Sequence, residues 1–145
     1  MPEPANRPRL TGVRMMRKVS HVLLALCLAP SLAFTQEARD SSGNLLVRIS
    51  GNEIRSSSGS LLYRFDGNDV RASNGSLYLQ IDGTDIRGAS GNLIGRFDGR
   101  DVRSGTGQLM GRVDGNDVRS GNGSLLGRTE GLSGRLAALY FFFLR

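Results

Sequence analysis

The stretch SLLYRFDGNDVRASNG, residues 60–75, recurs with small changes along most of the chain. Close copies follow one another every 16 residues and begin at residues 44, 76, 92 and 108. A half copy, residues 124–131, follows the last of them, and its missing half stands before the first, at residues 36–43. A short fixed period of this kind is typical of repeat proteins, in which each unit is one small structural motif.

Each unit is predicted to form a β-hairpin. Apolar and polar residues alternate on both sides of a Gly-Asn pair, which suits a two-residue turn with positive φ. This register places Phe65 opposite Val70 and Arg64 opposite Arg71. Simple alternation then predicts an inner face with Leu61, Tyr63, Phe65 and Val70, and an outer face with Leu62, Arg64, Asp66, Asp69 and Arg71.

The same position of the short turn is a glycine in every unit. The predicted turn glycines are Gly51, Gly67, Gly83, Gly99, Gly115 and Gly131. The expected outer face also carries one apolar residue per unit, at Leu46, Leu62, Tyr78, Ile94, Met110 and Leu126. Exposed apolar residues in a belt mark interaction surfaces, so self-association is one expectation. Otherwise the true register departs from simple alternation, or neighbouring strands cover these residues.

Hairpins of this kind can stack as an open solenoid or close into a ring. The matching half units at 36–43 and 124–131 favour closure, because their pairing leaves no strand edge free. The predicted fold is all-β, with tandem 16-residue hairpin repeats closing into a shallow, symmetrical barrel of about twelve strands over residues 34–134. The hairpins would project from this barrel as five or six petals, one for each repeat.

The chain ends in an apolar segment, residues 135–145. Its predicted plug residues are Leu136, Leu139, Tyr140, Phe141, Phe142, Phe143 and Leu144. One inward column of the barrel becomes small along the sequence, running Val47, Tyr63, Leu79, Gly95, Gly111 and Gly127. Small inward residues leave room for another segment. We therefore expect the tail to fill the barrel, with insertion into a membrane or a partner as the alternative.

The first 33 residues are typical of a secretory signal peptide. Basic residues, including Arg14, Arg17 and Lys18, precede a short apolar run that ends near Ala33. The leader would be cleaved after Ala33, and translation starting at Met15 or Met16 would give a more usual leader. Lipidation at Cys27 is disfavoured, because Leu26 precedes it where a small residue is needed. Export by the Sec route to the periplasm or the exterior is expected, with a peripheral position at a membrane as the alternative.

Composition excludes several functions once the leader is set aside. The remaining residues contain no Cys, His, Lys or Trp, which excludes thiol chemistry, His-based triads, Schiff-base lysines and Cys/His zinc sites. They keep 14 Arg against 12 Asp and Glu, so the net charge is only +2. A nucleic-acid partner would need a basic stripe, and none is expected.

Facing carboxylates recur in the repeat. The pairs are Asp66/Asp69, Asp82/Asp85, Asp98/Asp101 and Asp114/Asp117. Such pairs could serve a glycosidase, and Asp-Gly-Asn-Asp is similar to a calcium loop. However, an enzyme needs one distinguished site, and here every unit repeats the pair beside an Arg. We therefore expect a scaffold of Arg–Asp pairs, with no enzyme activity, cofactor or metal.

Taken together, the leader, the tandem G-x-L-L-G-R-(F/V)-D-G-N-D-V-R units and the Phe-rich end resemble the bacterial five-fold β-flower family. The resemblance covers roughly residues 36–145. It implies a shallow barrel of hairpin petals with the apolar C-terminal segment through or against its centre. This chain departs from the pattern in its six half-unit pairs and in ending on Arg145.

The expected role is exported and non-enzymatic, by binding or assembly. A peripheral membrane or lipid-interacting protein that uses the Phe-rich tail is the alternative. A carboxylate-dependent carbohydrate hydrolase is the remote one.

Overall fold

A computed structural model describes residues 35–145. The leader predicted over residues 1–33 lies outside the described residues, together with its cleavage site and Cys27. The described part consists of twelve β-strands followed by a short helical segment.

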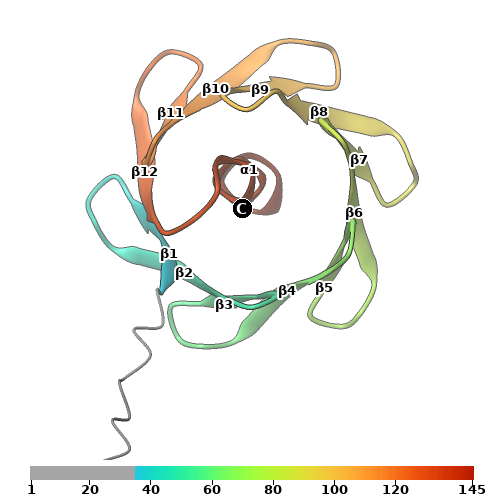
Figure 1. The fold of residues 1–145 in the computed structure, drawn as a ribbon, viewed down its shortest axis with the longest axis horizontal. Helices are drawn as coiled ribbons and strands as arrows, with labels where there is room; N and C mark the ends of the chain where they lie inside the picture. The colour runs from blue at the N-terminus through green and yellow to red at the C-terminus, as the bar shows by residue number, and fades with distance from the viewer. Residues whose placement is uncertain (1–34) are drawn as a thin grey trace, which may run out of the picture. The chain divides into compact units, whose positions relative to one another are not determined.

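The strands form one closed antiparallel barrel, in which the first strand pairs with the last. Figure 1 looks down this barrel and shows the ring complete. The strands are β1 (Gln36–Asp40), β2 (Leu45–Ser50), β3 (Glu53–Ser56), β4 (Leu61–Asp66), β5 (Asp69–Ala72), β6 (Leu77–Asp82), β7 (Asp85–Gly88), β8 (Leu93–Phe97), β9 (Asp101–Ser104), β10 (Leu109–Asp114), β11 (Asp117–Ser120) and β12 (Leu125–Glu130). The predicted fold class is confirmed.

The hairpin register is the predicted one around the short turns. Across β4 and β5, Phe65 lies opposite Val70 and Arg64 lies opposite Arg71. The turn between these strands begins at Gly67, whose φ is 60°, a region that side chains disfavour. The other predicted turn glycines also have positive φ: Gly51, Gly83, Gly99, Gly115 and Gly131.

The two ends of the barrel differ. At one end, called here the short-turn rim, two-residue turns such as residues 67–68 join the strands. At the other, the petal rim, longer turns such as residues 73–76 project outward in Figure 1. In six of these longer turns a glycine N–H donates to the carbonyl three residues before it, at Gly43, Gly59, Gly75, Gly91, Gly107 and Gly123. The barrel therefore has six petals.

A β-bulge at the petal end of each repeat corrects the predicted faces. Ile54 pairs with Tyr63, but the next residue, Arg55, pairs with Leu61, so Leu62 is an extra residue in its strand. An extra residue reverses the alternation beyond it. Leu61 therefore lies on the outer face beside Arg55, whereas Leu62 packs against the core.

The outer apolar belt predicted from simple alternation is therefore wrong. Its six positions are the bulged residues of their strands. Five of them are half-buried against the core: Leu46, Leu62, Ile94, Met110 and Leu126. The sixth, Tyr78, is 44% exposed.

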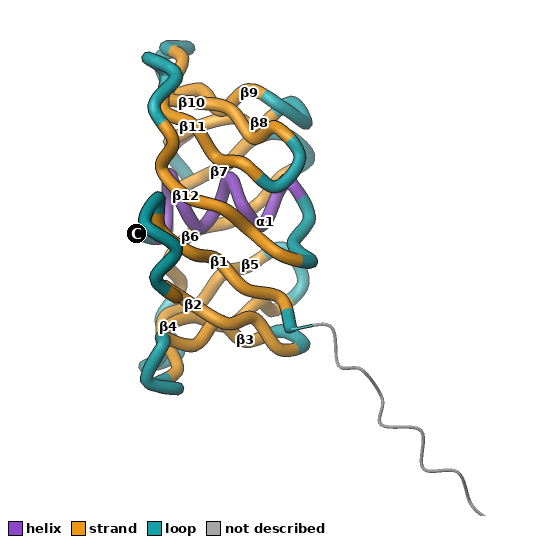
Figure 2. Tube along the Cα trace, turned by 90° about the vertical axis from the view of Figure 1, so that its left-hand side faces the viewer, coloured by secondary structure: helices purple, strands orange, loops and turns teal. Residues whose placement is uncertain are grey.

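The C-terminal segment runs through the barrel as α1 (Gly134–Leu139) and one π-helical turn, η1 (Tyr140–Leu144). Figure 2 shows this helix inside the wall of strands. Ser133 caps its start by accepting a hydrogen bond from the backbone N–H of Leu136. The helix enters at the short-turn rim, where Arg135 donates to the carbonyl of Gly83 at 2.7 Å. Within residues 35–145, no helix is long and apolar enough to cross a membrane.

Candidate functional site

Three consecutive phenylalanines of the tail meet three glycines of the barrel wall. An added Cβ at Gly95 would lie 2.5 Å from Cε1 of Phe143. Added Cβ atoms at the equivalent glycines of the next two repeats, Gly111 and Gly127, would each lie 2.6 Å from Cε1 of one ring, Phe142 and Phe141 respectively. The glycines are therefore required for the close approach of the helix to β8, β10 and β12.

The π-helical turn allows successive rings to contact successive repeats. Six repeats around the barrel place equivalent positions about 60° apart. An α-helix rotates successive side chains by about 100°, whereas the wider turn of a π-helix rotates them by less. Phe141, Phe142 and Phe143 can then face Gly127, Gly111 and Gly95 in order.

The other predicted plug residues also lie inside the barrel. Leu139, Tyr140 and Leu144 are buried, and Leu136 is half-buried. At the petal rim the hydroxyl of Tyr63 donates a hydrogen bond to the backbone carbonyl of Leu144 at 3.0 Å. This bond satisfies one of the last helical carbonyls, which have no partner within the helix.

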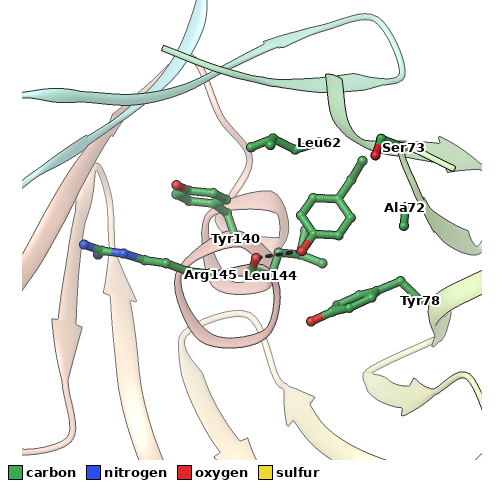
Figure 3. A pocket seen from close by; sticks show the side chains of 8 residues that line it. Leu62, Ala72, Ser73, Tyr78, Tyr140, Leu144 and Arg145 are labelled. Atoms are coloured by element: carbon green, nitrogen blue, oxygen red, sulfur yellow. Dashed lines mark hydrogen bonds between the residues drawn. The ribbon is translucent and has the colours of Figure 1, made fainter. Parts of the chain in front are cut away.

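A cleft opens at the petal rim beside the end of the helix. The wall that carries Gly95, Gly111 and Gly127 contacts the helix closely, whereas β4 and β6 on another side carry the larger Tyr63 and Leu79. The cleft between these strands and the helix end has a volume of about 410 Å³ (Figure 3). Its lining residues are Leu62, Tyr63, Ala72, Ser73, Tyr78, Tyr140, Leu144 and Arg145.

All three tyrosines of the chain line this cleft. The rings of Tyr63 and Tyr78 lie with their centroids 5.1 Å apart and tilted by 54°. Burial, followed by the neighbouring Tyr78, raises the pKa of Tyr63 above its ordinary value. Burial also raises the pKa of Tyr140, although the nearby Arg145 guanidinium opposes this. Both hydroxyls are therefore protonated at neutral pH and can donate hydrogen bonds.

The cleft was not predicted from the sequence as a site. Simple alternation places Tyr78 on the outer face, and Tyr140 was predicted only as part of the plug. One signal was available, because the unit at residues 76–91 departs from its neighbours by having Tyr78 and Gln80.

A comparison with protein families agrees with this architecture. The family model described as "5-fold beta-flower protein" matches residues 35–145. The chain belongs to the 5-fold beta-flower family. Neither a curated protein nor a solved structure matches it. This beta-flower chain has six petals rather than the five that the family description implies, because the half units at the two ends combine into a sixth.

The outer wall of this beta-flower barrel carries a ladder of ion pairs. In every repeat one carboxylate lies at hydrogen-bond distance from the arginine two residues later; for Asp117 and Arg119 the distance is 2.9 Å. Most also contact the arginine eleven residues later, as Asp117 does with Arg128 at 3.1 Å. The carboxylates of the ladder are Glu37, Glu53, Asp69, Asp85, Asp101 and Asp117.

The arginine two residues after each of these carboxylates also holds a petal. Arg71, for example, donates from Nη1 to the backbone carbonyl of Gly75 at 3.3 Å. The same contact recurs in the other repeats, from Arg39, Arg55, Arg87, Arg103 and Arg119. One side chain therefore connects the strand, its carboxylate and the petal turn.

Three of the four predicted carboxylate pairs face each other in the register, Asp66/Asp69, Asp82/Asp85 and Asp114/Asp117. Asp98 instead lies in the turn after β8, where its side chain accepts hydrogen bonds from the N–H groups of Arg100 and Asp101.

The two members of a facing pair differ. Asp66 lies opposite Asp69, as predicted. Asp69 accepts hydrogen bonds from Arg71 and Gln80, whereas the Asp66 side chain is 74% exposed at the rim. Within residues 35–145, no group of three or more carboxylates lies close enough to hold a metal ion. The inner carboxylates are therefore held in ion pairs along the wall or, at Asp69, also by Gln80.

The ladder has one break on the described wall. Gln80 stands where the other repeats have arginine, and its amide donates to Asp69 at 2.9 Å. A smaller cleft of about 230 Å³ lies here, lined by Asn68, Gln80, Ile81, Asp82 and Arg87. The irregular side chains Tyr78 and Gln80 thus belong to the same strand, β6.

Proposed function

We propose that the protein is an exported, non-enzymatic binding module whose ligand site is the cleft at the petal rim. The single observation that carries this proposal is the gathering of all three tyrosines around one cleft of a repetitive barrel. A repeat scaffold presents the same surface several times. A ligand site is therefore expected where the residues depart from the repeat, as Tyr63 and Tyr78 do.

The carboxylates support a non-enzymatic role. The inner member of each pair is engaged by arginine or by Gln80, which lowers its availability as a general base. The chain after residue 33 also has no Cys, His or Lys to act as an alternative nucleophile or base. A hydrolase would instead need one Asp pair with a role that the others lack.

The tail supports binding at the cleft over contact with lipid. Phe141 is buried, and Phe142 and Phe143 lie against the glycine wall. A lipid contact through these rings would first require the helix to leave the barrel. That step would expose the apolar interior that the helix covers, at about 25 cal/mol per Å² of apolar surface.

Thermal unfolding in the presence of small molecules tests the binding proposal. A ligand that binds only the folded chain raises Tm, and above Kd the rise grows with the logarithm of the ligand concentration. We expect at least one small-molecule class to raise Tm of residues 34–145 and to lose this effect in Tyr78→Ala. The chain should not sediment with phosphatidylglycerol vesicles and should remain in the supernatant. Sedimentation with vesicles, or turnover of a glycoside that a single Asp pair controls, would favour the alternatives.

Export is tested separately with the full chain. After expression in a Gram-negative host, we expect the protein in the periplasmic or extracellular fraction with Phe34 as its first residue. Retention in the cytoplasm with residues 1–33 attached would overturn this part of the proposal. A diacylated Cys27 at the amino terminus would instead establish lipidation.

A further inference from the structure

Two tyrosines at the petal rim lie against each other across one strand of the barrel. Tyr63 belongs to β4 and Tyr78 belongs to β6, and β5 lies between these strands. The two ring centroids are 5.1 Å apart, and the ring planes are tilted by 54°. This separation is within the range of about 4.5–7 Å that aromatic rings in contact adopt. The phenols of two successive repeats are therefore direct neighbours.

The hydroxyl ends of both rings lie near the end of the helix. The Tyr63 hydroxyl donates a hydrogen bond to the backbone carbonyl of Leu144 at 3.0 Å. Figure 3 shows the Tyr78 hydroxyl directed toward the same end of the helix. After burial, Tyr78 is also the neighbour that raises the pKa of Tyr63 most. The ring carbons next to the two hydroxyls therefore lie on neighbouring edges of the pair.

These ring carbons are the reactive positions of an oxidised phenol. When a phenol loses one electron and one proton, the resulting radical reacts at the carbons next to its oxygen. Tyr78 is 44% exposed, so an oxidant reaches its ring from solvent. Tyr63 is less exposed, but it lines the same open cleft. Both members of the pair are therefore accessible to oxidation.

The third tyrosine of the cleft lies in a different environment. The ring of Tyr140 packs edge-on against Phe141, with the centroids 5.3 Å apart. Phe141 has no hydroxyl and cannot form a phenol radical. Tyr140 is also only 6% exposed. The structure therefore offers one tyrosine pair within residues 35–145 and a third tyrosine that serves as a matched control.

We propose that Tyr63 and Tyr78 are the site of an oxidative cross-link, a dityrosine that ties β4 to β6. The oxidant is hydrogen peroxide, used by an enzyme of the haem-peroxidase class. Each tyrosine gives up one electron and one proton, and the two radicals form a carbon–carbon bond beside their oxygens. Each bonded carbon then loses its hydrogen as a proton, and each oxygen regains one. The two electrons and two protons lost overall reduce one peroxide to two waters.

The cross-link would supply a covalent tie that the chain otherwise lacks. The residues after position 33 contain no Cys, so they cannot form a disulfide. A bond between Tyr63 and Tyr78 would close a loop about one repeat long. Such a loop stabilises the folded chain because it restricts the unfolded one. We expect the bridged chain to have a higher Tm than the unbridged chain, and an equal Tm would overturn this stabilising role.

Trypsin separates the three tyrosines, which allows the bridge to be located. Cleavage after arginine places Tyr63 in residues 56–64, Tyr78 in residues 72–87 and Tyr140 in residues 136–145. Residues 34–145 are oxidised with a haem peroxidase and limiting hydrogen peroxide, then digested and analysed by mass spectrometry. We expect residues 56–64 joined to residues 72–87, with a mass lower than their sum by two hydrogen atoms.

Dilution separates a bridge within one chain from a bridge between copies. At a chain concentration of about 10 μM, we expect the bridge within one chain to exceed bridges between copies roughly a hundredfold, because neighbouring groups in one chain have effective concentrations in the millimolar range. Two copies joined through Tyr78 would instead give residues 72–87 linked to themselves.

Three single variants test the assignment. Tyr63→Phe and Tyr78→Phe each keep the ring and remove the hydroxyl, and each should abolish the joined peptide. The control Tyr140→Phe makes the same change at the third tyrosine and should leave the yield of the joined peptide unchanged. An unchanged Tm before oxidation shows that the barrel is intact in each variant.

Two results would overturn the inference. One is an oxidised, folded chain in which residues 56–64 and 72–87 are not joined. The other is joining of residues 136–145 to either peptide as often as these two join each other. The bridge needs no ligand, so both results leave the proposed binding function standing, and that function is decided by the Tyr78-dependent rise in Tm.

Discussion

At the scale of single residues, the position of the helix depends on side chains that are missing. Gly95, Gly111 and Gly127 occupy positions where the other repeats carry Val47, Tyr63 and Leu79. A phenyl ring fills the space above each glycine. The pairing of rings with glycines therefore determines which wall the helix contacts and, in turn, where the cleft remains open.

Substituting Gly95 with alanine tests this pairing. The new Cβ would lie 2.5 Å from Cε1 of the Phe143 ring and 2.8 Å from the carbonyl oxygen of Arg103, so the helix or the strand must shift. We expect a loss of about 1–3 kcal/mol in the free energy of unfolding, measured by urea denaturation. Gly88→Ala is the control, because its added Cβ meets the side chain of Asn92 and the equivalent residue Ala72 is already alanine. Equal losses in both variants would contradict the pairing.

The carboxylate ladder makes stability depend on pH. The hydrogen bond from Arg64, and then that from Arg55, lower the pKa of Glu53 below its ordinary value of 4.5. A lowered pKa in the folded chain stabilises it above the unfolded pKa, and this contribution is lost as the pH falls through the folded value. We therefore expect the free energy of unfolding to decrease as the pH falls below about 4.5.

The Glu53→Gln variant should show a shallower decrease over the same acidic range. The control Asp82→Asn removes a carboxylate that makes no ion pair within residues 35–145, and its pH profile should match that of the unmodified chain. Chemical denaturation at a series of pH values measures both. A Glu53→Gln profile parallel to that of the unmodified chain would show that the pair contributes nothing to acid sensitivity.

At the scale of the element, the bulge decides which of two neighbouring leucines is in the core. Leu126 packs against the core, whereas Leu125 lies opposite Arg119 on the outer face. We expect Leu126→Ser to cost about 1 kcal/mol more than Leu125→Ser in the free energy of unfolding, because Leu126 packs against the apolar core whereas Leu125 lies among the outer charged side chains. Urea denaturation of the two variants measures the difference. The reverse order would support simple alternation without a bulge.

Alternation predicted the strands well near the short turns and failed beyond the bulge. Phe65 and Val70 pair as expected, because the two-residue turn leaves little freedom in the register. The extra residue at Leu62 could not be seen from alternation, since Leu61 and Leu62 are the same residue type. The π-helical turn was likewise not predicted. It forms because the wall glycines around the helix set the directions in which the three phenyl rings must point.

At the scale of the whole molecule, the tail and the barrel share one buried core. Leu139, Tyr140, Phe141 and Leu144 belong to the same buried cluster as the strand residues. We expect a chain that ends at Gly134 to lose its cooperative thermal transition, because removing the helix leaves the barrel without its filling. Circular dichroism during heating measures this. A truncated chain that melts as the longer one does would show that the tail is not part of the core.

Closure of the barrel was predictable and the cleft was not. The half units at the two ends of the repeat match, so pairing of β1 with β12 follows from the sequence, with Ala38 opposite Thr129. The cleft depends instead on how the helix sits among unequal walls. That position results from packing between distant segments, which a repeat pattern does not contain.

The pairing of the first strand with the last also determines when the chain can fold relative to its synthesis. Glu37 pairs with Glu130, and the residues that fill the barrel come later still. Contacts so distant in the chain cannot form until nearly all of it has been made, and such non-local pairing slows folding. The chain therefore reaches its native fold only after its C-terminal residues have been synthesised. Until then it stays unfolded, and an unfolded chain can pass lengthwise through a narrow channel.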